Sequence, residues 1–578
     1  MTLKNLIKTN ATKEEIKDRP FILYEDLRLT HRQFYEESIQ YANMLLKLRH
    51  RTDVPFHVGV YMENLPEFLK VAGGAALAGA AVVGINTVQR GEFIARDINF
   101  CDCQILVTER KYLSELAPIK KDLSYIPESH ILVNTFWETE KEPLPFGIPL
   151  EEGLRQTQAE MGDAFFVDPD VDVKDSDLFM IIFTSGTTKA PKGVLNSHGK
   201  MVNFGHVACE VLNFTADDVA YAAMPLFHSN STFLAVMPAL INGGGVALIK
   251  KFSKSQFLKD VKRYGVTTFN YVGKPLAYIL TAEKKPDDHD NSLRIAFGNE
   301  ASAEHQKEFK ERFDCSVVEI FGSTEGGATS IRNDTDPPEC VGKPPEEIKI
   351  LNEKGEECPP ARFDASGKML NPEEAVGEIV NTGGLALFEG YYKNPEATQE
   401  RSLNNQYHTG DLAYKDEQGY MYFAGRDIEW ARVDGENFLT YPVEKIINRH
   451  QSVFLSSVYG VPDYDAGDQL MVSLLLEEGA EFDPKEFYEF LEKQTKLEMS
   501  PKWVPRYVCI RKEFPRTETN KILKRELQKQ KFDPDVVKDP IYWRERGDEE
   551  FKPFTSNDYE QLKKKFEETG NKHLLDIR

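Results

Sequence analysis

An apolar run of strand length, Leu178–Phe183, leads directly into a polar loop at 184–193. The loop reads Thr-Ser-Gly-Thr-Thr-Lys-Ala-Pro-Lys-Gly and contains four hydroxyls, two lysines, two glycines and no acidic residue. Small residues let several backbone N–H groups point toward one spot, and hydroxyl and ammonium groups add donors. Open α/β sheets bind ligands where polar loops follow buried strands. The stretch therefore predicts a polyphosphate loop in an α/β fold. It does not match the common P-loop pattern, and a plain surface turn is the alternative.

Apolar runs and helical segments alternate from about residue 56 to residue 250. The expected strands and helices are His57–Tyr61, Pro66–Leu77, Ala81–Ile85, Ile105–Val107, Ile131–Val133 and Lys200–Leu212. Such alternation predicts a largely parallel sheet covered on both faces. Before it, we predict a short strand at Phe21–Leu27 and a helix capped by Thr30 and Gln33. The Glu/Pro-rich segment 137–170 is expected to be irregular.

Three further apolar runs end in polar loops. They are Tyr221–Asn230 with His228 at its end, Leu293–Ala301, and Val317–Gly327 with Thr324 and Glu325. Thr324 could donate to a phosphate. Glu325 could hold Mg²⁺, which favours one or two carboxylates together with phosphate oxygens. The alternatives are a structural histidine and an ordinary solvated carboxylate.

The second part of the chain has a different pattern. Residues 332–375 predict loops and short antiparallel strands, and Tyr420–Phe423 has the composition of a hairpin. Asp411 and Arg426 lie at the ends of β elements, where they suit the hydroxyls of a sugar. Residues 430–545 predict a compact α+β domain. Lys521 lies in a polar turn before a helix at 522–530, and its chemistry alone does not distinguish it from a surface lysine.

Size and charge limit the classes of function. A chain of 578 residues should form more than one domain, and a net charge of −22 argues against a nucleic-acid partner. Seven scattered cysteines indicate reduced thiols in a cytoplasmic protein. The N-terminus lacks the apolar core of a signal peptide, and Val71–Ile85 is too short to span a membrane. No transmembrane segment is expected.

Seven of these signals, taken together, resemble the acyl-adenylate-forming superfamily of acyl-CoA synthetases, luciferases and peptide-synthetase adenylation domains. The resemblance covers about residues 20–545. The signals are Thr184–Gly193, Phe321–Glu325, Gly377-Glu-Ile, Gly390–Pro395, His408–Asp411, Gly425-Arg426 and Lys521. Gly298-Asn-Glu-Ala301, Trp430–Asn437 and the tail after Phe532 are similar to the branch of very-long-chain acyl-CoA synthetases and fatty-acid transport proteins.

The resemblance implies the domain organisation. We expect an α/β fold with a large N-terminal adenylation domain, 1–428, of mixed, mostly parallel sheets covered by helices plus a β-barrel-like subdomain. A small mobile α+β domain, 429–545, would carry Lys521, with Glu429 as its hinge. Residues 546–578 would form a C-terminal tail.

The resemblance also implies an ATP-dependent fatty acid–CoA ligase with ATP, Mg²⁺ and coenzyme A. Acyl-AMP and pyrophosphate form first, and the CoA thiol then displaces AMP. The implied roles are phosphate binding by Thr184, Ser185, Gly186, Thr187, Thr188 and Lys192; Mg²⁺ binding by Glu325; α-phosphate contact by Thr324; the adenine and acyl pocket at Asn299, Glu300, Ala301, Phe321 and Gly322; ribose binding by Asp411 and Arg426; charge neutralisation by Lys521; and a gate at His228.

Some expectations stay open. Lys189 stands where the family usually has Gly, and a positive φ there would cost a non-glycine residue roughly 1 kcal/mol. The enzyme could instead load a carrier protein, or activate a bile, aromatic or sterol-side-chain acid. A lipid transporter is a third reading. Peripheral membrane contact and a homodimer are further open points.

Overall fold

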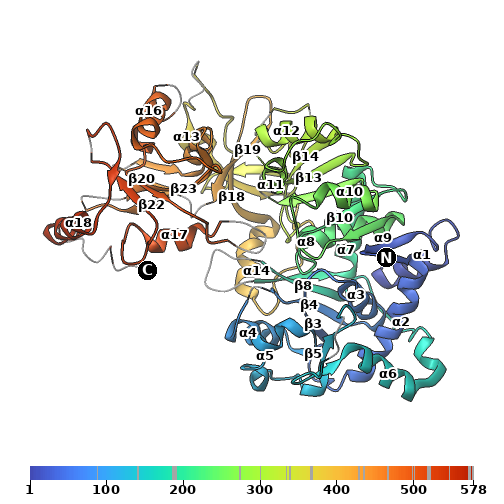
Figure 1. Cartoon of the computed structure of the whole chain (residues 1–578). Helices are drawn as coiled ribbons and strands as arrows, with labels where there is room; N and C mark the ends of the chain where they lie inside the picture. The colour runs from blue at the N-terminus through green and yellow to red at the C-terminus, as the bar shows by residue number, and fades with distance from the viewer. Residues whose placement is uncertain are drawn as a thin grey trace. The chain divides into compact units, whose positions relative to one another are not determined.

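The computed structural model describes residues 1–87, 89–138, 142–184, 192–272, 275–299, 301, 303–333, 335–337, 340–364, 369–426, 430–433, 436–464, 468–496, 499, 501–516, 522–545, 547–569 and 575. Its contacts divide the chain into two compact units. The first unit comprises residues 1–339 and 384–407, and the second comprises residues 340–383 and 408–578. Each unit has its own sheets (Figure 1).

A seven-stranded sheet in the first unit carries the predicted phosphate loop. Its order is β7-β6-β5-β3-β4-β8-β9, and all neighbours are parallel except the hairpin β8–β9. The strands are β3 (His57–Tyr61), β4 (Ala81–Gly84), β5 (Cys103–Glu109), β6 (Ile131–Asn134), β7 (Ile148–Pro149), β8 (Leu178–Thr184) and β9 (Lys192–Ser197). Every residue of β3, β4 and β5 is buried, as expected for strands covered on both faces.

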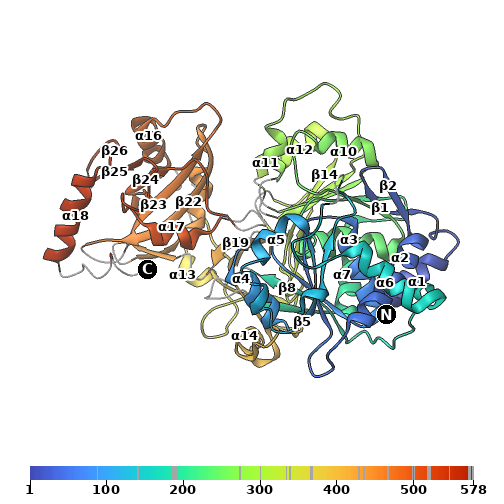
Figure 2. The same cartoon turned by 60° about the horizontal axis from the view of Figure 1, so that its bottom comes forward.

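Helices cover both faces of this sheet (Figures 1 and 2). One face packs against α2 (His31–Leu48) and α3 (Pro66–Ala78), with α1 (Leu3–Thr12) and α6 (Leu150–Met161) beside them. The other face packs against α4 (Glu92–Phe100) and α5 (Leu113–Leu116). Helices α2 and α3 approach closely because α3 has glycine at the contact: a Cβ on Gly74 would lie 2.6 Å from Cβ of Tyr41.

An eight-stranded sheet forms the rest of the first unit. Its order is β15-β14-β13-β12-β10-β11-β1-β2, parallel except at the edge strands β2 and β15. The strands are β1 (Pro20–Tyr24), β2 (Leu27–Thr30), β10 (Val219–Ala222), β11 (Gly245–Leu248), β12 (Thr268–Val272), β13 (Ile295–Asn299), β14 (Ser316–Phe321) and β15 (Ser330–Arg332). The helices beside it are α7 (His198–Leu212), α8 (Ser229–Ser231), α9 (Met237–Asn242), α10 (Phe257–Tyr264), α11 (Pro275–Leu280) and α12 (Ala303–Phe313).

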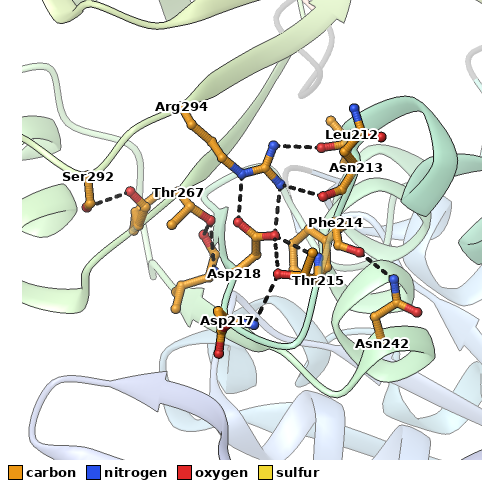
Figure 3. Close-up of polar contacts among 12 residues, drawn as sticks. Leu212, Asn213, Phe214, Thr215, Asp217, Asp218, Asn242, Thr267, Ser292 and Arg294 are labelled. Atoms are coloured by element: carbon orange, nitrogen blue, oxygen red, sulfur yellow. Dashed lines mark hydrogen bonds and ion pairs between the residues drawn. The ribbon is translucent and has the colours of Figure 1, made fainter.

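Arg294 ties the start of β13 to the end of α7 (Figure 3). Its Nε and Nη2 each donate to the Asp218 carboxylate at 2.8 Å, and its Nη1 donates to the Leu212 carbonyl at 2.7 Å. Its Nη2 also donates to the Asn213 carbonyl at 3.1 Å. The last carbonyls of a helix have no intrahelical partner, so Arg294 caps α7 and fixes where β13 begins.

The second unit contains three sheets. A sheet ordered β16-β17-β18-β19, in which β16–β17 and β18–β19 are antiparallel pairs, stands where the β-barrel-like subdomain was predicted. Its strands are β16 (Ile348–Leu351), β17 (Gly377–Asn381), β18 (Tyr407–Lys415) and β19 (Met421–Arg426); α13 (Pro372–Ala375) precedes β17. Strands β20 (Trp430–Val433) and β21 (Glu436–Leu439) form a hairpin. Helix α14 (Pro395–Arg401), coloured gold in Figure 1, belongs to the first unit.

The third sheet of the second unit is ordered β22-β23-β24-β25-β26. Its strands are β22 (Val453–Pro462), β23 (Asp468–Leu476), β24 (Tyr507–Ile510), β25 (Ile541–Trp543) and β26 (Lys552–Pro553). Helices α15 (Tyr441–Ile447) and α16 (Pro484–Thr495) bury side chains on one face, and α17 (Lys524–Gln530) and α18 (Ser556–Glu568) on the other (Figure 2). The α/β fold class is confirmed. The boundary near residue 428 stays a prediction.

Two predictions about elements were wrong. Phe21–Leu27 is not one strand, because the chain turns at Glu25, whose φ is 48°, and pairs β1 with β2. The segment 137–170 is not irregular throughout, since it contains β7 and the 12-residue helix α6. The capping box at Thr30 and Gln33 is confirmed, as are most predicted strands of the first unit.

Candidate active site

The phosphate loop leaves β8 at Thr184 and returns to β9 at Lys192. These two residues face each other in the antiparallel pair, and Thr184 Oγ1 donates to the Lys192 carbonyl at 3.4 Å. Ser185, Gly186, Thr187, Thr188 and Lys189 lie outside the described residues, so their predicted phosphate contacts stay predictions.

Two loops that are distant in sequence meet at Thr324. Its Oγ1 lies 2.7 Å from Oγ of Ser229, which follows His228 directly. His228 precedes α8, and its ring lies 4.6 Å from that of Phe227, centroid to centroid. Burial lowers the pKa of His228 to about 4, so its imidazole is neutral at pH 7. Ser229 was missed by sequence reasoning, and its only signal was its position beside His228.

Glu325 is buried, with 8% of its surface exposed. The Tyr391 hydroxyl donates to its Oε1 at 2.8 Å, while Oε2 accepts no hydrogen bond from the described residues. No group of three or more His, Cys, Asp or Glu that could hold a metal occurs in the described ranges. A single carboxylate with one oxygen that accepts no hydrogen bond from the described residues still fits Mg²⁺, which takes its other ligands from phosphate and water. Glu325 would hold the ion, and the ion would neutralise charge on the phosphates.

Lys192 also contacts Tyr391. The Lys192 Nζ lies 5.1 Å from the centroid of the Tyr391 ring and 3.9 Å from the Glu400 carboxylate. One tyrosine thus contacts both predicted residues: the ring of Tyr391 contacts the phosphate lysine, Lys192, and its hydroxyl contacts the metal ligand, Glu325. Tyr391 lies inside the motif Gly390–Pro395, but sequence reasoning gave it no role.

The end of β13 carries the predicted nucleotide pocket. Gly298 lies so close to the Tyr271 carbonyl that a Cβ would collide with it. The buried Oδ1 of Asn299 has no hydrogen-bond partner among the described residues, which makes it an available acceptor. Gln306 donates to the Ala301 carbonyl at 2.8 Å and to Glu319 at 3.0 Å, and so holds the loop. Glu300 lies outside the described residues.

Phe321 ends β14, and the two glycines nearest to it on the C-terminal side, Gly322 and Gly326, differ in the space around them. Gly322 has room for a side chain, with Thr329 Oγ1 at 3.6 Å as the nearest atom to an added Cβ. Gly326 does not, because its φ is +73° and an added Cβ would lie 2.6 Å from the Phe204 ring. The Phe204 ring stacks on Phe233 at 4.3 Å, so aromatic side chains form an apolar wall next to Glu325.

The predicted ribose residues lie in the second unit. Asp411 on β18 pairs with Arg426 on β19, and the backbone N–H of Asp411 donates to Thr409 Oγ1 at 3.0 Å. Glu378 orders the same turn, because it accepts from the Gly410 N–H at 2.7 Å and lies 2.8 Å from Nδ1 of His408. The backbone pairing places Asp411 and Arg426 opposite each other, and their role in ribose binding stays a prediction.

Lys521 and Glu429 lie outside the described residues. The base of the loop that contains Lys521 is described: Arg516 and Ile522 form an antiparallel bridge, and the Leu523 N–H donates to the Pro515 carbonyl at 2.8 Å. Lys524 anchors the helix that follows, with Nζ 2.9 Å from Glu444 Oε1.

Family models match most of the chain. The model of the AMP-binding enzyme matches residues 8–392, and the model of the AMP-binding enzyme C-terminal domain matches residues 442–521. The chain belongs to the AMP-binding enzyme family. The predicted resemblance to the acyl-adenylate-forming superfamily is therefore confirmed.

Curated relatives of this AMP-binding enzyme cover nearly its whole length. A steroid-22-oyl-CoA synthetase of Rhodococcus jostii is 41% identical over 91% of this chain and 91% of that protein. The medium/long-chain-fatty-acid–CoA ligase FadD17 of Mycobacterium marinum is 40% identical over 84% and 89%. Long-chain fatty acid transport protein 6 of Mus musculus is 29% identical over 94% and 88%.

Among solved structures, the anthranilate CoA ligase AuaEII in complex with anthranoyl-AMP has a TM-score of 0.77. It is 21% identical and covers 91% of this chain and 96% of its own, which shows a shared fold. This AMP-binding enzyme is an AMP-forming acyl-CoA synthetase, an acid–thiol ligase that uses ATP and CoA. None of the helices in the described part of the chain combines the length and apolar character needed to cross a membrane.

Proposed function

We propose that the enzyme is a fatty acid–CoA ligase that works in two steps. In the first step, a carboxylate oxygen of the acid attacks the α-phosphate of ATP and forms acyl-AMP with release of pyrophosphate. In the second step, the thiol of CoA attacks the acyl carbon, AMP leaves, and a thioester forms. Both steps need positioning and charge neutralisation, and neither needs a protein nucleophile.

The hydrogen bond between Ser229 and Thr324 carries the proposal. It joins the loop after β10 to the loop after β14, with the neutral His228 on one side and Glu325 on the other. Hydroxyl donors and a metal-binding carboxylate at one point suit the α-phosphate, where both charge and the new bond develop. Thr324 donates to that phosphate, and Glu325 binds Mg²⁺.

The remaining roles follow from the same assignment. Thr184, Lys192 and the loop between them hold the outer phosphates. Asn299 offers its unused oxygen to the amino group of adenine. Asp411 and Arg426 bind the ribose hydroxyls, and Lys521 neutralises charge at the α-phosphate.

The stacked rings of Phe204 and Phe233 next to Gly326 support an apolar acid. A hydrocarbon tail gains about 0.8 kcal/mol for each buried CH₂ group, so an aromatic wall favours a medium or long chain. The relative that is 40% identical and named as a medium/long-chain-fatty-acid–CoA ligase supports the same class. A steroid side-chain acid is the second candidate, because the relative that is 41% identical is named as a steroid-22-oyl-CoA synthetase.

The test supplies purified enzyme with MgATP, CoA and either C12–C18 fatty acids or a steroid side-chain acid. We expect AMP and an acyl thioester, quantified by liquid chromatography and mass spectrometry, with the higher kcat/KM for a fatty acid. A higher value for the steroid acid would favour the second candidate. Release of ADP, or no CoA-dependent product, would refute the proposal. Thr324→Val, which removes the hydroxyl and keeps the shape, should lower adenylation about 10²-fold.

A further inference from the structure

The five residues Glu389–Lys393 form an anchored segment between β9 and Glu325. Glu389 accepts from the Ser197 N–H at 2.7 Å and from its hydroxyl at 2.5 Å. The Gly390 carbonyl accepts from the Leu195 N–H at 3.1 Å, and the Tyr392 N–H donates to the Gly193 carbonyl at 2.7 Å. The segment therefore pairs with the strand that leaves the phosphate loop.

The side chains of the same segment reach two carboxylates on opposite sides. The Tyr392 hydroxyl donates to Asp102 Oδ2 at 2.6 Å, and Lys393 Nζ donates to Asp102 Oδ1 at 2.8 Å. The Tyr391 hydroxyl instead donates to Glu325 Oε1. Neighbouring tyrosines thus make the same chemical contact, one with a structural carboxylate and one with the predicted metal ligand.

Tyr391 has little freedom to move. Only 4% of its surface is exposed, its N–H donates to Thr398 Oγ1 at 3.0 Å, and its ring lies 5.3 Å from that of Phe388. Its hydroxyl also takes part in a hydrogen bond with Arg401. Because a guanidinium only donates, the Tyr391 oxygen accepts from Arg401 and its own proton points to Glu325.

A tyrosine held in this way fixes one oxygen of Glu325 and leaves the other oxygen free. The Lys192 ammonium over the ring face adds a cation–π contact, so the tyrosine also helps to position the predicted phosphate lysine. Because Tyr391 contacts both groups and has little freedom to move, it constrains the distance between the Glu325 carboxylate and the Lys192 ammonium.

We propose that Tyr391 is a positioning residue that holds Glu325 ready for Mg²⁺ and keeps it in register with Lys192. The proposal rests on the proposed role of Glu325 as the metal ligand. Removing the Tyr391 hydroxyl frees the carboxylate to rotate, and each metal-binding event must then order it again.

The experiment measures metal binding directly, apart from turnover. Mn²⁺ replaces Mg²⁺, and electron paramagnetic resonance follows its binding to the enzyme saturated with the non-hydrolysable analogue α,β-methylene-ATP. The variants are Tyr391→Phe, the matched control Tyr392→Phe, and Glu325→Gln. We expect Tyr391→Phe to weaken Mn²⁺ binding about tenfold to a hundredfold, the loss of one hydrogen bond to a charged group. Tyr392→Phe should bind Mn²⁺ as the wild type does.

The outcomes separate the two proposals. Loss of binding in Glu325→Gln with wild-type binding in Tyr391→Phe would overturn the positioning role and leave the metal ligand in place. Wild-type binding in Glu325→Gln would remove the metal assignment and, with it, this inference. Equal losses in both tyrosine variants would mean that the segment is only structural. Thermal unfolding of each variant checks that it folds, and Tyr391→Phe should convert supplied acyl-AMP to thioester at the wild-type rate.

Discussion

The buried carboxylate of Asp218 binds the guanidinium of Arg294, the residue before β13. Burial alone would raise its pKa, but the Arg294 guanidinium, which donates to both carboxylate oxygens, and the Thr215 N–H outweigh burial and lower it (Figure 3). A carboxylate with a lowered pKa stabilises the folded state above the unfolded pKa, here 3.8. That contribution is lost as the pH falls through the folded pKa.

We therefore expect Asp218→Asn to lower the free energy of unfolding by about 2 kcal/mol at pH 7, the scale of a hydrogen bond to a charged group. The difference in Tm between wild type and variant should narrow as the pH is lowered from 5 toward 3. Thermal unfolding at several pH values measures it. Asp217→Asn is the matched control, because Asp217 is exposed and, among the described residues, its carboxylate pairs with Arg19 alone, at 2.7 Å. A difference that stays constant with pH would contradict the assignment.

Single residues were predictable where the chain itself places them together. Thr324 and Glu325 follow one apolar run, so the sequence shows them at one strand end. Ser229 and Tyr391 were missed because their partners lie 95 and 66 residues away. The role of a hydroxyl in a loop can be inferred only when the fold shows which residue of a second loop it contacts.

The packing of α2 on α3 shows how a helix pair depends on small residues. A Cβ on Gly74 would lie 2.6 Å from Cβ of Tyr41 and 2.9 Å from the Ala42 nitrogen, and the latter is backbone that cannot turn aside. Gly74→Ala should therefore destabilise the protein by about 1 to 3 kcal/mol through overpacking.

Denaturant unfolding tests this prediction. The usual preference of helices for alanine over glycine acts in the opposite direction, by up to about 1 kcal/mol. An unchanged or raised stability would show that the two helices can separate without loss. Gly153 in α6 is the comparison, since an added Cβ there meets only the side chains of Leu132 and Met44, at 3.2 Å and 3.3 Å.

Elements with a strong local signal were predicted well. Thr30 and Gln33 form the capping box, and β3 begins and ends at the predicted residues, His57 and Tyr61. The turn at Glu25 was missed because no Gly or Asn marks it. Helix α6 was missed because it buries only Leu150, Gly153 and Thr157, a set too small and too polar to show a helical period.

The chain forms two compact units, and the residues with proposed catalytic roles divide between them by sequence. Thr324 and Glu325 belong to the first unit and Lys521 to the second. We expect Lys521→Ala to lower adenylation by several orders of magnitude and to leave the conversion of supplied acyl-AMP to thioester intact. Pyrophosphate release and thioester formation, assayed separately, measure the two steps. Lys529→Ala, at a half-exposed pair with Glu526, is the control. Equal loss of both steps would contradict the division.

Composition and alternation were enough to predict an α/β fold with several domains, because hydrophobic periodicity records which faces are buried. They could not fix where the units divide. Residues 384–407 return to the first unit through long-range contacts such as that of Tyr392 with Asp102. The cytoplasmic location, the homodimer and the domain boundary stay predictions.

The Glu389–Lys393 segment is synthesised long after Asp102 and β9, which it contacts. Asp102 leaves the ribosome 290 residues before Tyr392, a wait of about 15 to 60 s at typical translation rates. Between the synthesis of β9 and that of residues 390–392, the Leu195 N–H and the Gly193 carbonyl lack the partners that they have in the finished fold, so the outer edge of β9 is open. An open strand edge can pair with another chain, so we expect misassembly of the unfinished enzyme at this edge until the Glu389–Lys393 segment emerges.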